Sequence, residues 1–297
     1  MKALYLVAGL SKQAHHQGLE RQRTQAAKEV VYVRLMEEVR AMHPGMGLRA
    51  IYDLVQPEGI GRDAFVALGL REGFRLKALG RQVRTTYRVK VSRYRNLLPG
   101  RRFTDVNQLW SSDITYLHCL GRFYYVVLIM DVYSRRIVGY SVADNMRAEN
   151  NLRALQMALT LRGASHYGGG LIHHSDKGSQ YASDLYTNTL DAYGVGISMC
   201  NEVYENTHIE RLHDTIKNQY LGRMEIKSER ELKQKVEQVV NTYNHHRPHK
   251  SLGKLTPVAY EEHIKTLSGH QRMSMEIYTT EKSINDQHPN QLKLVFC

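Results

Sequence analysis

The chain has 297 residues, a formal net charge of +12 and a sequence pI near 9.5. Its length suggests about two domains, and its charge favours a polyanionic partner, either nucleic acid or an acidic membrane surface. The first residues lack the pattern of a signal peptide and no apolar run approaches the roughly 18 residues of a membrane span, so we expect a cytoplasmic protein without membrane contact.

Residues 1–75 are predicted to be helical and to begin with a helix-turn-helix unit. A short helix over residues 2–8 and a glycine break precede a second helix over residues 11–20, for which Ser11 is the N-cap. This second helix is rich in Lys, Gln and His, as expected of a helix that contacts DNA. Lys12 is its candidate DNA contact.

A second unit of the same kind is predicted after a longer helix over residues 22–42. Its two helices span residues 48–55 and 61–70 and are joined by a turn at residues 56–59. A helical pair with a glycine turn is also common in proteins that never touch DNA, but two pairs beside a basic segment favour a DNA-binding region. The expected core of the second unit is Ile51, Leu54, Phe65, Val66 and Leu70.

The positive charge is concentrated in residues 71–102, which hold eleven Lys/Arg and one acid and so carry +10 of the net +12. We expect residues 76–105 to be a basic linker that neutralises DNA phosphates, so that binding weakens steeply as the salt concentration rises. The candidate DNA contacts in this segment are Arg81, Arg84, Arg88, Lys90, Arg93 and Arg95.

From residue 106 the pattern changes to the apolar alternation of β-strands, and residues 106–264 are predicted to form one α/β domain. Its order of three strands, helix, strand, helix, strand, helix is that of the ribonuclease H fold, a mixed five-stranded sheet with flanking helices. A further helix follows, and residues 265–297 are predicted to be a tail. The expected strands are residues 109–119, 122–133, 135–144, 171–175 and 194–200, and the expected helices are residues 147–162, 183–193 and 205–221.

Three acids occupy unusual positions in this predicted domain. Asp113 interrupts the first strand, Asp176 ends the fourth, and Glu210 lies on the helix after the fifth. A carboxylate in such a place is costly unless something compensates its charge. Magnesium prefers hard oxygen ligands, and two such ions roughly 4 Å apart promote in-line displacement at phosphodiesters. The sequence therefore predicts a site for Mg²⁺ or Mn²⁺ that acts on phosphodiester bonds.

Lys217 follows Glu210 by two turns of the predicted helix, so its ammonium group can reach a DNA phosphate beside the metal site. Asp214 lies on the same face, either in solvent or in competition with Glu210 for metal. A helix face of mixed charge is often merely solvated, which is the alternative interpretation. The opposite, core-facing positions are Ile209, Leu212, Ile216 and Tyr220.

Other polar residues near the acids have weaker signals. His174 is a candidate substrate contact, although a histidine within a strand is more often packed or hydrogen-bonded. Lys177 and Ser179 lie in a loop whose amides can bind DNA phosphate, or can cap the next helix. Asp131 is expected to fix the turn that follows its strand, and Trp110 is expected to pack under the first strand.

Five motifs occur in order: WSSDITY, MDVYSRRIVGYSV, HHSDKGSQYAS, YENTHIERLHDTIKNQY and YNHHRPHKSLGKLTPVAY. Together they resemble the catalytic, second-frame protein of bacterial insertion-sequence transposases, which has a retroviral-integrase-like core. The likeness covers about residues 45–262. It implies that Asp113, Asp176 and Glu210 are the DDE metal ligands and that Lys217 is the lysine that follows the glutamate.

The resemblance also implies the partners. Double-stranded DNA is expected as both element end and target, with a homo-oligomer assembled on it at the bacterial nucleoid. A DNA-binding protein from an upstream reading frame is a further expected partner. The loop before the glutamate is shorter here than is usual in the family, so Glu202 and Glu205 remain alternatives to Glu210.

We therefore predict a DNA transposase that cleaves the ends of its mobile element and joins the 3′-hydroxyl to target DNA. One alternative is a non-catalytic DNA-binding regulator or decayed relative, in which the sheet domain is only a scaffold. Another is a ribonuclease-H-like nuclease that cuts without joining. Magnesium-dependent nicking of element ends separates the regulator from the two enzymes.

Overall fold

The computed structural model describes residues 11–79, 93–163, 165–200 and 206–277, and the chain divides into two compact units, Met1–Gly80 and Arg81–Cys297. The division falls inside the basic segment that was predicted to be a linker. Each unit has its own buried apolar core. Within the described ranges, every helix is too short or too polar to cross a membrane.

The first unit begins with one long helix, α2 (Lys12–Met42). Its predicted N-cap is confirmed, because the Ser11 side chain accepts a hydrogen bond from the Ala14 amide at 3.0 Å. The predicted end of this helix near residue 20 is wrong, since α2 continues without interruption. No proline or glycine occurs between Leu19 and Met42, and most residues there are good helix formers. The helix predicted at residues 2–8 lies outside the described residues.

The predicted second helical pair is confirmed as α3 (Leu48–Val55) and α4 (Arg62–Arg71). These helices pack with α2 around a core that includes Met36, Ile51 and Phe65. Val66 is half-buried, but the prediction that Leu54 and Leu70 are core is wrong, because they are 36% and 44% exposed. Both lie in the final turn of their helices, where the packed face has turned away.

The second unit is built on a five-stranded sheet in the order β4-β3-β2-β5-β6. Strands β2, β3 and β4 form an antiparallel meander, whereas β5 runs parallel to β2 and β6 parallel to β5. The predicted fold class, a ribonuclease-H-like mixed sheet with flanking helices, is confirmed. The strands are β2 (Leu109–Cys119), β3 (Arg122–Asp131), β4 (Ile137–Ala143), β5 (Ile172–Ser175) and β6 (Gly196–Met199).

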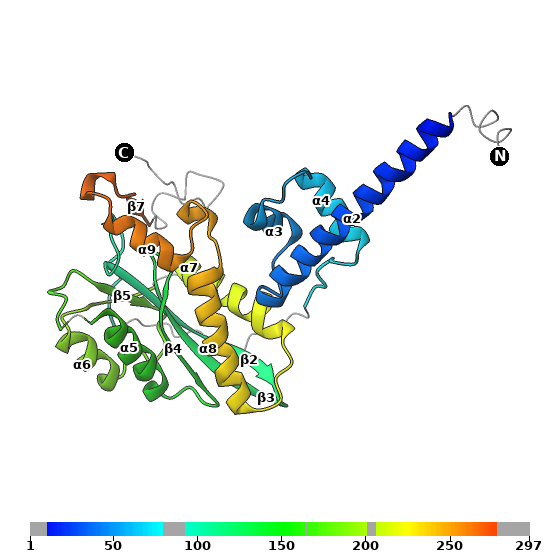
Figure 1. Cartoon of the computed structure of the whole chain (residues 1–297). Coiled ribbons are helices and arrows are strands. Elements are labelled where there is room, and N and C mark those ends of the chain that lie inside the picture. Colours follow the sequence, from blue (N-terminus) through cyan, green and yellow to red (C-terminus); the bar gives the residue numbers. More distant parts are fainter. Residues whose placement is uncertain (1–10, 80–92, 164, 201–205, 278–297) are drawn as a thin grey trace, which may run out of the picture. The chain divides into compact units, whose positions relative to one another are not determined.

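Helices cover both faces of the sheet (Figure 1), because successive side chains of a strand point to opposite faces. Trp110 and Val127 join the apolar cluster beneath α5 and α6, whereas Leu109 and Leu128 join the cluster beneath α7 and α8. Trp110 is fully buried, which confirms its predicted packing. The helices are α5 (Ala148–Arg162), α6 (Asp184–Ala192), α7 (Thr207–Asp214), α8 (Glu229–His246) and α9 (Pro257–Lys265).

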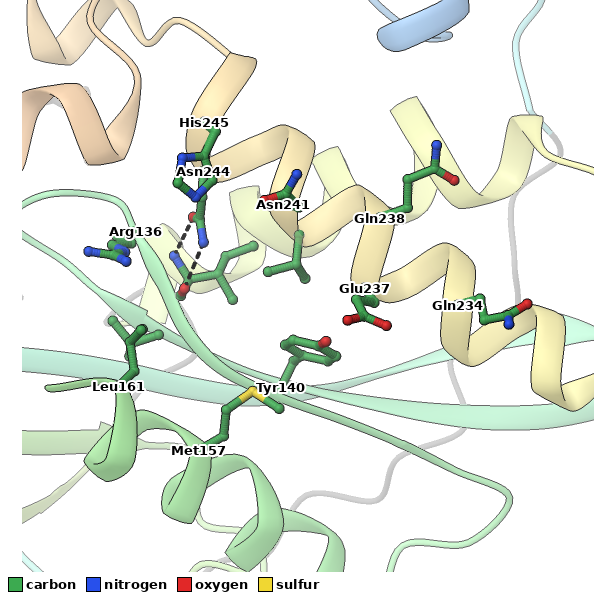
Figure 2. A pocket seen from close by; sticks show the side chains of 13 residues that line it. Arg136, Tyr140, Met157, Leu161, Gln234, Glu237, Gln238, Asn241, Asn244 and His245 are labelled. Atoms are coloured by element: carbon green, nitrogen blue, oxygen red, sulfur yellow. Dashed lines mark hydrogen bonds between the residues drawn. The ribbon is translucent and has the colours of Figure 1, made fainter. Parts of the chain in front are cut away.

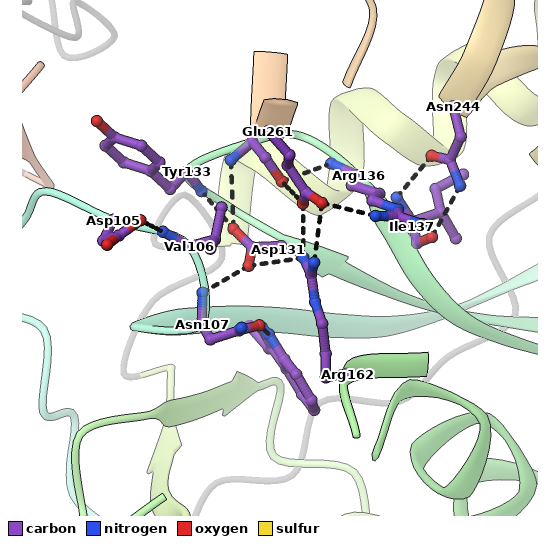
Figure 3. A network of polar contacts seen from close by, with 12 residues as sticks. Asp105, Val106, Asn107, Asp131, Tyr133, Arg136, Ile137, Arg162, Asn244 and Glu261 are labelled. Carbon is purple, nitrogen blue, oxygen red and sulfur yellow. Dashed lines mark hydrogen bonds and ion pairs between the residues drawn. The ribbon is translucent and has the colours of Figure 1, made fainter. Parts of the chain in front are cut away.

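A buried ionic network joins the end of β3 to α5 and α9 (Figure 3). Asp131 accepts a hydrogen bond from the Ser134 amide at 3.2 Å, which confirms its predicted role in the turn. The same carboxylate pairs with Arg162 at 3.1 Å, and Arg162 reaches Glu261 at 2.7 Å. Arg136 pairs with Glu261 at 2.6 Å. Burial raises the pKa of Asp131, and the charge of Arg162 opposes that rise.

The described residues after α9 return to the second unit. A 3₁₀ turn (Gly269–Gln271) leads into β7 (Met275–Glu276), which pairs antiparallel with β1 (Arg102–Phe103). Residues 265–276, expected to begin a tail, therefore carry regular structure. The apolar segment at the end of the sequence lies outside the described residues.

Candidate metal and DNA site

Asp113 and Asp176 are brought together by the register of two parallel strands. Ser112 of β2 is paired with Ser175 of β5, and each aspartate is the next residue along its chain. Adjacent strands lie about 4.8 Å apart. Asp113 and Asp176 therefore occupy neighbouring positions in the chain traces where β5 ends.

Tyr181 lies beside both aspartates, and its hydroxyl is 2.9 Å from the hydroxyl of Ser112. Burial raises the pKa of Tyr181 well above its usual value, and the charges of Asp113 and Asp176 add to that rise. Tyr181 is therefore a neutral phenol that can donate a hydrogen bond.

The loop after β5 shapes the surroundings of Asp176. Burial of the carboxyl group raises its pKa, although the residue as a whole is exposed, and a hydrogen bond from the Gly178 amide (3.0 Å) opposes the rise. A side chain at Gly178 would place its Cβ 2.9 Å from the Asp176 carboxylate, so a larger residue here would displace that carboxylate. Lys177 is half-buried and Ser179 is exposed in this loop.

Glu210 is exposed in the first turn of α7, and Asn206 ties the start of that helix to β2. The Asn206 side chain accepts a hydrogen bond from the Ser111 hydroxyl and donates one to the Ser112 carbonyl at 3.3 Å. An asparagine at an N-cap normally binds the amides of its own helix, but this one makes no such bond. Asn206 instead links the helix of Glu210 to the residues that directly precede Asp113.

Lys217 does not lie on a continued α-helix. α7 ends at Asp214, and a π-helical turn (Thr215–Tyr220) follows it. The Lys217 ammonium stands 4.3 Å from the centre of the Tyr116 ring on β2, a cation–π contact. Partial burial lowers the pKa of Lys217. The pairing of β5 with β2 ends at Ser112. Lys217 therefore contacts β2 at Tyr116, past the end of that pairing and on the same strand as Asp113.

The donor set at this place suits a hard divalent cation. Two neighbouring carboxylates can share Mg²⁺ or Mn²⁺, with water and substrate phosphate as further ligands. Across the described ranges, however, no three His, Cys, Asp or Glu side chains are close enough together to hold a metal ion. The structure thus pairs Asp113 with Asp176 and leaves Glu210 on the tethered helix, outside a three-ligand cluster.

His174 is buried one residue before Ser175. Its Nδ1 lies 2.9 Å from the Ser198 hydroxyl, and its Nε2 lies 3.2 Å from the Cys200 sulfur. Burial lowers the pKa of His174 to about 4, so the ring is neutral. The structure therefore places this predicted contact in the packing between β5 and β6.

The predicted DNA contacts in the basic segment are only partly described. Arg93 donates to the Ala182 carbonyl at 2.6 Å and pairs with Asp184 at 3.2 Å, both just before or within the start of α6. The backbone carbonyl of Arg95 accepts from the Met199 amide at 3.5 Å. The remaining predicted contacts, which are Arg81, Arg84, Arg88 and Lys90, lie outside the described residues. The side chain of Lys12 also lies outside the described part of the structure.

A separate open pocket of about 560 Å³ lies between β4, α5 and α8 (Figure 2). It is lined by side chains such as Tyr140, Met157 and Glu237. None of the three predicted acids lines it. Phosphoryl transfer to a polymer needs an accessible surface, and the acids lie on such a surface.

Sequence reasoning assigned no role to Tyr181 or Asn206. Asn206 precedes Glu210 by four residues, and its contact with Ser111 spans 95 positions in the sequence, so no local pattern indicates it. The motif HHSDKGSQYAS contains Tyr181, but nothing in the local pattern indicates that its hydroxyl meets Ser112. These side chains connect the elements that carry the acids.

Two protein-family models, both described as integrase core domain, match this chain over residues 104–203 and 199–257. The transposase of insertion sequence element IS629 from Shigella sonnei is 32% identical over 226 residues, which cover 74% of this chain and 75% of that protein. The 31 kDa protein of insertion element IS600, also from Shigella sonnei, is 33% identical over 162 residues. That match covers 54% of this chain and spans only 58% of the IS600 protein.

Among solved structures, the catalytic core domain of HTLV-2 integrase in complex with magnesium aligns with a TM-score of 0.42 and 19% sequence identity. The alignment covers 56% of this chain and 99% of the integrase core.

Proposed function

This chain belongs to the family of insertion-sequence transposases with an integrase core domain, and we propose that it cuts the ends of a mobile DNA element and joins the freed 3′-hydroxyl to target DNA. The observation that carries the proposal is the pairing of Ser112 with Ser175 between two parallel strands, because Asp113 and Asp176 are the residues that directly follow them. Two carboxylates held at this spacing repel each other unless a cation lies between them. Glu210, carried by the helix that Asn206 ties to β2, is the proposed third ligand.

The reaction is an in-line displacement at phosphorus. In the first step the oxygen of water forms a bond to phosphorus, and the bond to the 3′-oxygen of the element strand breaks. In the second step that 3′-oxygen attacks a target phosphodiester, and the target 3′-oxygen leaves. Mg²⁺ or Mn²⁺ bound to the acids would activate the attacking oxygen and stabilise the leaving one. Tyr181 is not a nucleophile in this scheme, because its hydroxyl is buried and neutral.

Other side chains of the site orient the DNA. Lys217, held against Tyr116, offers a positive charge to a phosphate next to the scissile bond. Lys177 and Ser179 follow Asp176 directly, so their side chains and amides can contact the same strand. His174 has a structural role in this proposal, because its ring links β5 to Ser198 of β6.

The proposed partners follow from the reaction. The substrate is double-stranded DNA, both element end and target, and joining two ends favours a homo-oligomer assembled on the DNA. A DNA-binding protein from an upstream frame is a further proposed partner. The protein acts at the nucleoid in the bacterial cytoplasm.

Nicking and strand-transfer assays on labelled element ends test the proposal. The wild-type protein should cut and join in Mg²⁺ and lose both activities in EDTA. Asp113→Asn, Asp176→Asn and Glu210→Gln should each abolish both activities while DNA binding persists. Asp191→Asn, which neutralises an exposed acid on α6, is the matched control.

The outcomes separate the proposal from its rivals. Full strand transfer by Asp113→Asn or Asp176→Asn would overturn it. Binding without any nicking would indicate a regulator, and nicking without joining would indicate a nuclease. If Glu210→Gln stays active, Glu202→Gln and Glu205→Gln identify the third ligand.

A further inference from the structure

Two neighbouring arginines in the turn after β3 have different environments. Arg136 pairs with Glu261 at 2.6 Å. Arg135 is half-buried, as Arg136 is, but its hydrogen bond is to the sulfur of Met275 at 3.9 Å. In the part of the chain that the structure describes, no carboxylate stands within ion-pairing distance of Arg135. Its backbone also adopts φ 62°, a conformation that side chains rarely take.

The C-terminal end of α8 and the residues after it lie close to Arg135. Asn244 makes two hydrogen bonds of 2.9 Å to the backbone of Ile137, which fixes the C-terminus of α8 two residues from Arg135. The preceding residue, Tyr243, is buried and stacks edge-on with His249 at a ring distance of 4.9 Å. The motifs YSRRI and HHRPH, which the metal site does not use, thus meet in space.

Arg247 and α7 complete this group. Arg247 donates to the Gln219 side chain at 2.7 Å and to the Tyr220 hydroxyl at 3.3 Å, and both partners are neutral. From α7, the guanidinium group of Arg211 contributes a positive charge, whereas His208 on the same side of the helix is neutral because burial lowers its pKa. His208 lies about 200° around the helix from Glu210, so this side faces away from the acids.

Electrostatic interactions among these groups agree with this arrangement. Burial, opposed by Tyr243 and assisted by the charge of Arg211, lowers the pKa of Arg135 to about 10. Burial and then the charges of Arg247 and Arg135 hold the pKa of His249 at about 3. The buried Nε2 of His249 has no hydrogen-bond partner.

The uncompensated charge calls for an anion. A desolvated guanidinium is costly without a partner, and here the guanidinium groups of Arg135 and Arg211 also repel each other. Asp131 acts on Arg135 from a distance, but its own ion pair is with Arg162 at 3.1 Å. A ligand that brings negative charge would relieve both the desolvation and the repulsion.

We propose that Arg135, Arg247 and His249, with Arg211 at the rim, form a second binding site for a phosphate group, separated from the acids by α7. Guanidinium groups bind phosphate oxygens through paired N–H donors, which explains arginine rather than lysine at this place. The ligand is the backbone phosphate of a DNA strand. Only this choice of DNA over free phosphate rests on the proposed function.

Two measurements on purified full-length protein test the site. The first is the melting temperature in inorganic phosphate against sodium chloride of matched ionic strength, because a ligand that binds the folded state raises it. The second is the affinity for a DNA duplex across a salt series, whose log–log slope falls by about 0.9 for each lost phosphate contact. The variants are Arg135→Met and Arg211→Met, and Arg230→Met, exposed on α8, is the control of equal charge.

Arg135→Met should melt no lower than wild type in chloride, because it removes an unpaired cation, and it should lose the phosphate-specific rise. Its salt slope should fall by about 0.9, and Arg211→Met should reduce both effects. Arg230→Met should keep the phosphate-specific rise.

A phosphate-specific rise and a salt slope that are unchanged in both variants would overturn the site. If Arg135→Met does not fold, Arg211→Met decides alone. A lost phosphate effect with an unchanged DNA slope would overturn the assignment to DNA and leave free phosphate as the ligand. Because neither measurement needs cleavage, a wild-type protein that fails to nick DNA would refute only the proposed function.

Discussion

Replacing Asn206 with alanine should uncouple α7 from β2 and so separate Glu210 from Asp113. The side chain is 5% exposed, and it makes one hydrogen bond to the Ser111 hydroxyl and one to the Ser112 carbonyl. A buried partner left without its hydrogen bond costs about 1–3 kcal/mol, so the free energy of unfolding should fall by about 2–4 kcal/mol. A shift of about 1 Å in Glu210 should lower the nicking rate about 100-fold.

Chemical denaturation and single-turnover nicking measure these two effects separately. Ser111→Ala and the double variant complete a thermodynamic cycle, and the tether predicts that the two losses are less than additive. Asn188→Ala, at an exposed position on α6, should match wild type in both assays. The reasoning is refuted if Asn206→Ala nicks at the wild-type rate, or if its loss of rate equals the fraction of protein that is unfolded.

Three further substitutions probe the frame of the domain. Arg162→Met should lower the free energy of unfolding by about 3–5 kcal/mol, because it leaves the buried carboxylate of Asp131 without its ion pair and Glu261 with Arg136 as its remaining cation; a loss below about 1 kcal/mol in urea denaturation would contradict this. Gly139→Ala should prevent stable folding, since its Cβ would lie 2.1 Å from the Ala154 carbonyl oxygen on α5, and a wild-type melting temperature would show that this contact relaxes. Burial lowers the pKa of His213 to about 3, so its unfolded form binds more protons below about pH 6.5 and this residue lowers stability as the pH drops, by at most about 1.4 kcal/mol per unit. His213→Leu should reduce the total slope between pH 7 and 5 by about that amount, and an equal slope in both proteins would exclude a contribution from His213.

The succession of strands and helices could be predicted because the information is local. Alternation of apolar and polar residues marks β2, β3 and β4, short turns make them antiparallel neighbours, and intervening helices make β5 and β6 parallel. The acids could be singled out for the same reason, since Asp113 and Asp176 break otherwise apolar runs. What brings them together is the register of Ser112 with Ser175, which follows from the fold.

Other features depend on contacts that no local pattern contains. Lys217 was expected on a continued α-helix, two turns after Glu210. It lies instead in the π-helical turn that follows Asp214, and its ammonium group contacts the Tyr116 ring. The interruption predicted near residue 20 does not occur, because α2 continues from Lys12 to Met42.

Paired and unpaired charges are likewise indistinguishable in sequence. Arg135 and Arg136 are adjacent and chemically identical, yet only Arg136 meets the carboxylate of Glu261, which is contributed by α9. The apolar positions of α4 illustrate the same limit, because Leu68 is buried whereas Leu70, near the helix end, is exposed. Burial at an element's end is decided by its neighbours.

Anomalous diffraction from crystals grown with Mn²⁺ tests the shared cation of Asp113 and Asp176 most directly. A peak within bonding distance of an oxygen from each carboxylate is the result expected for the wild-type protein, and it should disappear in Asp113→Asn. A wild-type map at saturating Mn²⁺ with no peak between these two residues, or with the ion bound at other side chains, would contradict the proposed site.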